Sequence, residues 1–203
     1  MKLNAAEKFL RDNLLRTALQ RRHEAPLLEQ FGGRLAGGRA LEIGCGRGIG
    51  TELIFRRFGA REVHAFDLDP DMVTQVRKRP GGYPAGCLDP YVAAATAISE
   101  PDASFDAVFD FGIVHHVPDW DTALTKVVRV LKPGGRFYFE EVIRQALDRR
   151  AYRKFLEHPR ENRFSKETFP AALERRGIRL AGRTAERFFG DFVIGVGWKG
   201  KLA

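Results

Sequence analysis

The sequence contains few residues of the kinds that hold disulfides or metals. It has only two cysteines, Cys45 and Cys87, and its five histidines do not form the pairs typical of a zinc site. Small secreted domains depend on disulfides, whereas a chain of 203 residues buries enough surface to fold without them. We therefore expect no bound metal and a reducing, cytoplasmic compartment.

Long apolar runs are also missing. The longest ones, such as the run near residues 105–114, fall far short of the ~20 residues that a membrane-spanning helix needs. The first 22 residues mix charged and apolar side chains and lack the continuous apolar core of a secretory signal. The sequence thus predicts neither export nor membrane insertion, and its length is that of one domain.

Acidic residues are outnumbered, and the imbalance is uneven. The formal net charge is +8, and residues 1–40 and 144–187 together carry 21 basic against 10 acidic groups. The segment between them is acidic. Such asymmetry indicates attraction to an anionic partner, or it is the solvated surface of an arginine-rich protein, and the sequence leaves both interpretations open.

Apolar segments alternate with helical patterns through most of the chain. We expect strands near residues 39–43, 63–66, 91–95, 105–111 and 136–141, and helices near residues 3–23, 51–58, 70–79 and 120–131. Short connections between such segments are typical of a parallel sheet covered by helices on both faces.

The last third of the chain has a different pattern. A basic helix is expected over residues 144–155, and a second helix ends at Gly177. Strands over residues 179–188 and 192–198 flank a tight turn and so must pair antiparallel. The predicted fold is α/β, a Rossmann-like, doubly wound and mostly parallel seven-stranded sheet with an antiparallel C-terminal hairpin and helices on both faces.

A glycine-rich segment, ALEIGCGRGIG at residues 40–50, joins an expected strand to an expected helix. Glycines there let the backbone approach a ligand, and the amides at the start of the helix can bind polar groups. A dinucleotide fingerprint that begins at Gly44 requires glycine at position 49, where this sequence has Ile49. NAD is therefore disfavoured.

This segment resembles the first motif of class I S-adenosylmethionine-dependent methyltransferases. Glu42, Gly44, Gly46 and Gly48 fill the family's E/D-x-G-x-G-x-G signature. Three later segments, VHAFDLDPDM, PDASFDAVFDFGIVHHVPDW and RVLKPGGRFYFEEV, follow in the family's order and resemble its second, fourth and fifth strands. The resemblance is close over residues 38–143 and favours the small-molecule branch that includes quinone-ring methylating enzymes.

The resemblance implies S-adenosylmethionine as the cofactor. Asp67, 23 residues past Gly44, corresponds to the acid that holds the ribose hydroxyls. Ala94 stands where the family commonly has an aspartate for the adenine amino group, so adenine recognition is expected to rest on nearby backbone and apolar contacts. The predicted cofactor-binding residues are Glu42, Gly44, Cys45, Gly46, Gly48, Asp67, Leu68, Ala95, Thr96, Ala97 and Asp110.

The candidates for catalysis lie after the fourth and fifth strands, because ligands of such sheets bind outside the carboxyl ends of the strands. Methyl transfer mainly requires the nucleophile to be held in line with the methyl group, at ~3–3.5 Å. A hydroxyl or protonated amine acceptor also needs a base, for which His115 is the first candidate and Glu140 the second, with Asp110 nearby. Glu140 and Glu141 face opposite sides of their strand, so at most one points into the site.

The chain is expected to form a single domain, residues 1–203. Residues 1–35 are predicted to form a helical lid, residues 38–143 the cofactor-binding core, and residues 144–203 the substrate-side helices and the terminal hairpin. The predicted partner is a small-molecule acceptor, which the basic flanks suggest is anionic or presented at a membrane surface. No obligate protein partner is evident.

Two alternatives stay open from the sequence. One is a non-catalytic cofactor-binding subunit or sensor, which the alanine at position 94 allows. The other is a methyltransferase acting on a lipid or on nucleic acid. Base-amino methyltransferases carry a D/N-P-P-aromatic run after the fourth strand, and this sequence has DFGIVHH there, which disfavours nucleic acid. The acceptor atom is not determined.

Overall fold

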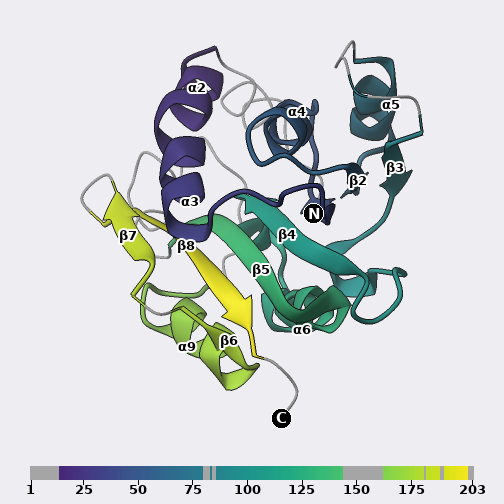
Figure 1. Cartoon of the computed structure of the whole chain (residues 1–203). Coiled ribbons are helices and arrows are strands. Elements are labelled where there is room, and N and C mark those ends of the chain that lie inside the picture. Colours follow the sequence, from purple (N-terminus) through teal and green to yellow (C-terminus); the bar gives the residue numbers. More distant parts are fainter. Residues whose placement is uncertain are drawn as a thin grey trace.

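The computed structural model describes residues 14–79, 83, 86–143, 162–180, 182–187 and 190–200. In these residues the strands form one twisted sheet (Figure 1) in the order β3-β2-β1-β4-β5-β8-β6, with β7 also paired to β8. Strands β1 to β5 are parallel, and β8 is antiparallel to β5. The strands are β1 (Arg39–Ile43), β2 (Glu62–Asp67), β3 (Leu88–Val92), β4 (Phe105–Phe111), β5 (Leu131–Val142), β6 (Ile178–Arg179), β7 (Thr184–Arg187) and β8 (Phe192–Lys199).

Helices cover both faces of the sheet, as the sequence predicts. Figure 1 shows α2, α3, α4 and α5 on one face and α6 and α9 on the other. Their bounds are α2 (Leu14–Leu19), the π-helical η1 (Gln20–Glu24), α3 (Ala25–Gly32), α4 (Ile49–Arg56), α5 (Pro70–Lys78), α6 (Trp120–Val130) and α9 (Thr168–Arg175), and two 3-10 turns are η2 (Ala95–Ala97) and η3 (Val114–His116). The doubly wound α/β fold is confirmed.

The predicted terminal hairpin differs in detail. The strand expected over residues 179–188 is divided into β6 and β7, and both pair with β8, so the described sheet has eight strands instead of seven. A turn separates the two pieces: Arg183 N donates to Leu180 O at 2.9 Å, and Gly182 has a φ of 69°. Because a left-handed residue interrupts a strand, the extended pairing stops there and resumes at Thr184.

The first helix is longer than the pattern predicts. We expect it to end before Pro26, but α2, η1 and α3 follow one another without a break up to Gly32. Pro26 lies at the start of α3, directly after the π-helical turn η1, and does not interrupt the helix. Ala25 and Leu28 are completely buried in the core on this face. Residues 3–13 of the predicted helix, and the whole predicted helix at 144–155, lie outside the described residues.

The third strand begins earlier than predicted. It spans Leu88–Val92 rather than residues 91–95, and it includes Pro90. Proline lacks the N–H that a central strand needs, but β3 pairs on one side only in the described sheet, and an edge strand tolerates it. Residues 95–97 therefore form η2 instead of a strand.

The side chains of β5 alternate between the two layers of the core. Phe137 and Phe139 are buried on the α6 face, and Tyr138 is buried on the α3 face, where its hydroxyl donates to the carbonyl oxygens of Gly32 and Gly33 at 3.0 and 2.8 Å. The same alternation continues to the end of the strand. It sends Glu140 and Glu141 to opposite faces, as the sequence predicts.

Candidate active site

The glycine loop follows β1 at the carboxyl edge of the sheet. Gly44, Gly46 and Gly48 all have positive φ angles, and a Cβ on Gly44 would lie 2.2 Å from Ile113 Cγ1. Only glycine fits there, because both the backbone conformation and the close approach exclude a side chain. Gly48 precedes the first turn of α4, whose free amides face the loop.

Asp67 holds this loop against β2. Its Oδ2 accepts from Gly46 N at 2.9 Å, and its Oδ1 accepts from Asp69 N at 3.0 Å. The carboxylate is mostly buried, and each oxygen keeps a second lone pair for another donor. Asp69 in turn caps α5 by accepting from Asp71 N at 3.1 Å. The acid thus has the capacity to bind two ligand hydroxyls from a fixed position.

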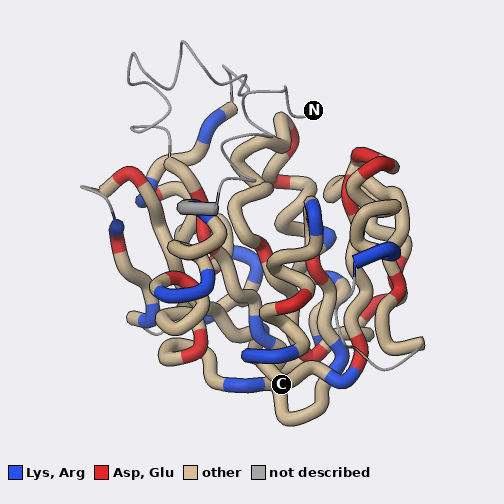
Figure 2. The backbone as a smooth tube through the Cα atoms, turned by 90° about the horizontal axis from the view of Figure 1, so that it is seen from above, with Lys and Arg blue, Asp and Glu red and all other residues tan. Residues whose placement is uncertain are grey.

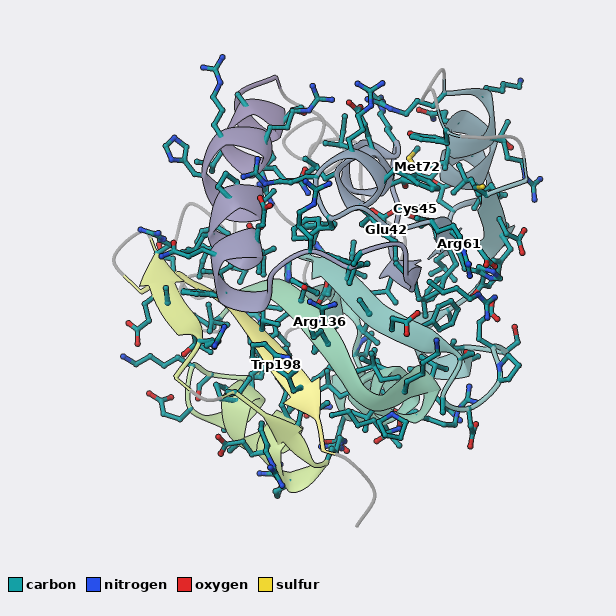
Figure 3. The ribbon with its side chains drawn as sticks, viewed as in Figure 1. Glu42, Cys45, Arg61, Met72, Arg136 and Trp198 are labelled. Atoms are coloured by element: carbon teal, nitrogen blue, oxygen red, sulfur yellow. The ribbon has the colours of Figure 1, made fainter. Side chains whose placement is uncertain are left out.

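Glu42 lies beneath the start of α4. Thr51 Oγ1 donates to its carboxylate, and a Cβ on Gly50 would lie 2.1 Å from Glu42 Oε1. Figure 3 shows Glu42 and Cys45 at the end of β1, below α4. Burial raises the pKa of Glu42 to about 8, and the nearby Asp67 adds to the rise. Near neutral pH this carboxyl is therefore protonated in the majority of molecules.

The raised pKa of Glu42 predicts a pH-dependent stability. A carboxyl with a pKa near 4.5 in the unfolded chain and about 8 in the folded chain takes up a proton on folding between these values. The free energy of unfolding therefore falls as pH rises from ~4.5 to ~8. We expect Glu42→Gln to reduce this fall and to be more stable than the wild type by roughly 2–4 kcal/mol at pH ~8.5. Urea unfolding of both proteins at several pH values between ~4.5 and ~8.5 measures this difference in the free energy of unfolding.

The control is Glu174→Gln, which removes an exposed carboxyl from α9. Its curve of stability against pH should follow that of the wild type. Equal slopes in Glu42→Gln and in the wild type would show that Glu42 carries the same charge in the folded and unfolded chains.

The predicted adenine side of the site is apolar. Leu68 is 40% exposed after β2, and Val92 is 54% exposed at the end of β3. Beyond them, η2 places Ala95, Thr96 and Ala97 at the same edge, and Ala93 N donates to Asp67 O at 3.2 Å. This bond puts Ala94 at the carboxyl edge, whereas Asp89 lies nearer the amino end of β3, with its Oδ2 3.8 Å from His64 Nδ1.

An acid introduced at position 94 should supply the adenine acceptor that this chain lacks. We expect Ala94→Asp to tighten S-adenosylmethionine binding by roughly threefold to tenfold, because a hydrogen bond to a charged group contributes about 1.5–3 kcal/mol before losses in ordering. The gain should vanish with a cofactor analogue that lacks the adenine amino group. Calorimetry checks both. Strongly weakened binding of that analogue to the wild type would mean that another group already accepts from the amino group.

Three polar residues lie close together at the ends of β4 and β5 and in the η3 turn. Asp110 and His115 are predicted site residues, and Glu141 is not among them. Asp110 is completely buried, and its Oδ1 accepts from Ile113 N at 2.9 Å. Glu141 Oε1 accepts from Ile113 N at 3.1 Å and from Val114 N at 2.7 Å. Its Oε2 accepts from His115 N at 3.1 Å and lies 2.5 Å from His115 Nδ1. One carboxylate thus fixes both the η3 turn and the imidazole ring.

The electrostatics of this network set the protonation of its members. Burial, with the Glu141 charge beside it, holds the pKa of Asp110 well above its usual range, and burial raises the pKa of Glu141 to about 7. Asp110 therefore keeps its proton, and Glu141 is the carboxylate of the pair. With His115 Nδ1 donating to Glu141, Nε2 is the ring nitrogen that carries the lone pair.

Glu140 does not join this network. It lies on the opposite face of the sheet, where its Oε1 accepts from Arg16 Nη2 at 2.9 Å. Glu140, the second candidate base of the sequence analysis, thus lies apart from His115 and Asp110, and Glu141 is the glutamate beside them. The alternation of side chains along β5 points to Glu141. It shares the face of Phe137 and Phe139, and η3 packs on that face through Val114.

The two adjacent histidines have different surroundings. His115 is 9% exposed and His116 is half-buried, with their ring centroids 4.1 Å apart. His115 also lines a cavity of about 10 Å³ with Trp120 and Phe164, which is room for about one water molecule. This cavity is too small to hold an acceptor.

Two kinds of feature are absent from the described part of the chain. No group of three or more histidine, cysteine, aspartate or glutamate side chains there is arranged to hold a metal ion. In the same part of the chain no helix is both long and apolar enough to cross a bilayer.

The sequence of the core matches a known family. Residues 41–139 match the family described as a methyltransferase domain. Over these residues the chain resembles class I methyltransferases. The family uses S-adenosylmethionine, so the resemblance inferred from the sequence and the cofactor that it implies are both confirmed. The glycine loop, Asp67 and the buried network all lie within or next to the matched range.

The methyltransferase domain has curated relatives and a solved structural neighbour. The chain is 32% identical over 130 residues to the fatty-acid O-methyltransferase of Mycolicibacterium smegmatis, which covers 64% of this chain and 45% of the relative. It is 36% identical over 111 residues to the ubiquinone biosynthesis O-methyltransferase of Xanthomonas oryzae pv. oryzae, which covers 54% and 45%. The chain thus matches less than half the length of these relatives.

A solved complex between the Haloferax volcanii Trm112 methyltransferase activator and a methyltransferase contains a chain with the same fold. The TM-score is 0.77 at 16% identity, over 98% of this chain and 99% of that one. At this identity the likeness shows the fold of the methyltransferase domain and nothing of its acceptor.

Proposed function

We propose that this chain transfers the methyl group of S-adenosylmethionine to an oxygen atom of a small-molecule acceptor. The observation that carries the proposal is the meeting, at one sheet edge, of the glycine loop, Asp67 and the network of Asp110, Glu141 and His115. Both curated relatives described above are named O-methyltransferases, which supports oxygen as the acceptor atom.

The residues at the edge fit the cofactor. The glycine loop leaves backbone space, Asp67 has lone pairs for two ribose hydroxyls, and Leu68 with η2 offers an apolar surface for the adenine ring. Glu42 and Cys45 lie on the side where the methionine end would be held. The bound cofactor supplies an electrophilic methyl group, so the protein has to orient the acceptor and exclude water.

His115 is proposed as the general base. Its Nε2 would take the proton of an acceptor hydroxyl as the oxygen attacks the methyl carbon. Glu141 is a positioning residue: it holds the ring through Nδ1 and stabilises the imidazolium that forms. Asp110 keeps its own proton and shares the amide of Ile113 with Glu141, which keeps both carboxyls in place. A carboxylate acceptor carries no proton and would need no base.

The acceptor-binding elements are proposed outside the packed core. Residues 25–32 of the predicted lid, and residues 168–175 after it in the chain, bury side chains against the sheet and belong to the packed core. Figure 2 shows basic and acidic residues interspersed over the described chain. Arg149, Arg150 and Arg153, part of the basic surplus, lie outside the described residues.

An anionic acceptor, free or presented at an anionic membrane surface, is the finer proposal, in a cytoplasmic setting that the low cysteine content suits. If basic flanks attract the acceptor, kcat/KM should fall as salt rises from ~20 to ~300 mM, because the Debye length shortens well below ~10 Å. Charge reversal of Arg149, Arg150 and Arg153 should flatten the slope. A rate independent of salt in both proteins would leave the basic residues without a role in recognition.

The reaction itself is tested with acceptors of three classes. Dodecanoate, a catechol and octylamine, each with S-adenosylmethionine that carries a deuterated methyl group, are analysed by mass spectrometry. We expect labelled methyl ester or ether and no methylated amine. Methylation of the amine alone would refute the oxygen acceptor, and cofactor binding without any methylated product, also in cell extract, would favour a non-catalytic sensor.

A further inference from the structure

A second cavity lies away from the network around His115. It has a volume of about 400 Å³ and is lined by residues of α2, η1, α3, β7 and β8. Figure 1 shows where these elements lie. Ile194 in its wall belongs to the core on the α3 face, whereas Val114 beside His115 belongs to the core on the other face. The sheet therefore separates the two sites. The cavity is lined by Leu19, His23, Glu24, Leu27, Arg187 and Ile194.

The inner end of this cavity is acidic. Glu24 is almost fully buried, and Arg16 Nη1 donates to its carboxylate. The same guanidinium donates through Nη2 to Glu140 Oε1 at 2.9 Å, and Glu140 Oε2 is buried with no hydrogen-bond partner among the described residues. Two carboxyls thus share one cation. Burial and the neighbouring Glu24 hold the pKa of Glu140 well above its usual range, so a proton balances the second negative charge.

The outer end is basic and the middle is apolar. His23 and Arg187 are exposed at the mouth, one from η1 and one from the end of β7. Leu19, Leu27 and Ile194 supply the apolar part of its wall. A purely apolar ligand would bring no hydrogen-bond donor to the buried Glu24 carboxylate. An anion with an apolar tail would bury that tail against the carboxylate and would also bring no donor.

We propose that this cavity binds a zwitterion with an apolar body, whose primary ammonium group donates to Glu24 and whose carboxylate meets Arg187 and His23. The ammonium group would supply the positive charge that the proton on Glu140 now supplies. Binding therefore releases that proton to solvent. Among the described residues, the other charged or titratable groups near this pair are Arg16, His23 and Arg187 at the mouth, and Glu141 on the opposite face of the sheet. The site is separate from methyl transfer.

The probes are 8-aminooctanoate and its two halves, octanoate and octylamine, titrated by calorimetry into the full chain without cofactor near neutral pH. We expect 8-aminooctanoate to bind at least roughly tenfold more tightly than either half, because each charged end adds a charge-assisted hydrogen bond. Its binding heat should differ between Tris and phosphate buffers in the sense of proton release. A ligand that merely fills an apolar cavity would show no such difference.

Variants show which residue binds each charged end of 8-aminooctanoate. Glu24→Gln should lower the affinity for 8-aminooctanoate to that for octanoate and abolish the proton release. Arg187→Ala, at an exposed position, should lower the affinity for 8-aminooctanoate to that for octylamine without affecting the fold. Arg175→Ala removes the same charge from an exposed position of α9 and should leave the affinity unchanged. The proposal is overturned if octanoate binds as tightly as the zwitterion, if none of the probes binds, or if Glu24→Gln keeps wild-type affinity.

Discussion

Asp67→Ala is expected to weaken S-adenosylmethionine binding by roughly 10²–10⁴-fold, because two ribose hydroxyls lose a charged acceptor and each such bond contributes about 1.5–3 kcal/mol. The fold should survive. The amides of Gly46 and Asp69 lose a buried acceptor as well, so we expect a loss of roughly 1–3 kcal/mol for each bond in the free energy of unfolding. Calorimetry gives the affinity, and urea unfolding gives the stability.

Asp89→Ala is the matched control for Asp67. It removes an exposed acid from the neighbouring strand β3, away from the carboxyl edge. Cofactor affinity in this variant should stay within about twofold of the wild type. A folded Asp67→Ala protein that binds the cofactor as well as Asp89→Ala does would remove Asp67 from the cofactor site.

His115→Asn is expected to lower kcat for a hydroxyl acceptor by roughly 10²–10⁴-fold, the usual contribution of a general base, while cofactor affinity stays unchanged. The loss for a carboxylate acceptor should be less than about tenfold, since that acceptor has no proton to give up. Glu141→Gln should act in the same direction and shift the acid limb of the pH profile of kcat, because the imidazolium loses its carboxylate.

His116→Asn provides the comparison for His115. It removes the same ring from the next position of the same turn, at a ring-centroid distance of 4.1 Å. We expect a change in kcat of no more than a fewfold for either acceptor class. Equal losses in both histidine variants, or equal losses for hydroxyl and carboxylate acceptors, would show that His115 supports the turn and does not take a proton.

The arrangement of strands and helices follows from local patterns. The glycine loop after β1, the cap of α5 at Asp69 and the end of α9 before Gly177 are all visible as residue types at fixed offsets. The errors occur where tertiary structure outweighs a local signal. Pro26 is typical of a position beyond a helix, but it lies in the first turn of α3. Pro90 is typical of a loop, but it lies in the edge strand β3.

The candidate site, too, is only partly predictable from the sequence. A strand ending in two glutamates shows that they face opposite sides, but it does not show which side contains η3. That choice depends on how residues 112–116 pack, because Glu141 meets three backbone amides and one imidazole of this turn. The partner of Glu140 was equally hidden, since Arg16 lies 124 residues earlier in the chain.

The most direct test of the account is a crystal structure of the chain with S-adenosylhomocysteine, the demethylated product. We expect the ribose hydroxyls to donate to Asp67, the adenine ring to lie against Leu68 and η2, and the sulfur to point toward the edge that Asp110 and His115 share. A product molecule bound elsewhere, or bound at this edge with its ribose away from Asp67 and its sulfur away from His115, would contradict the proposed active site.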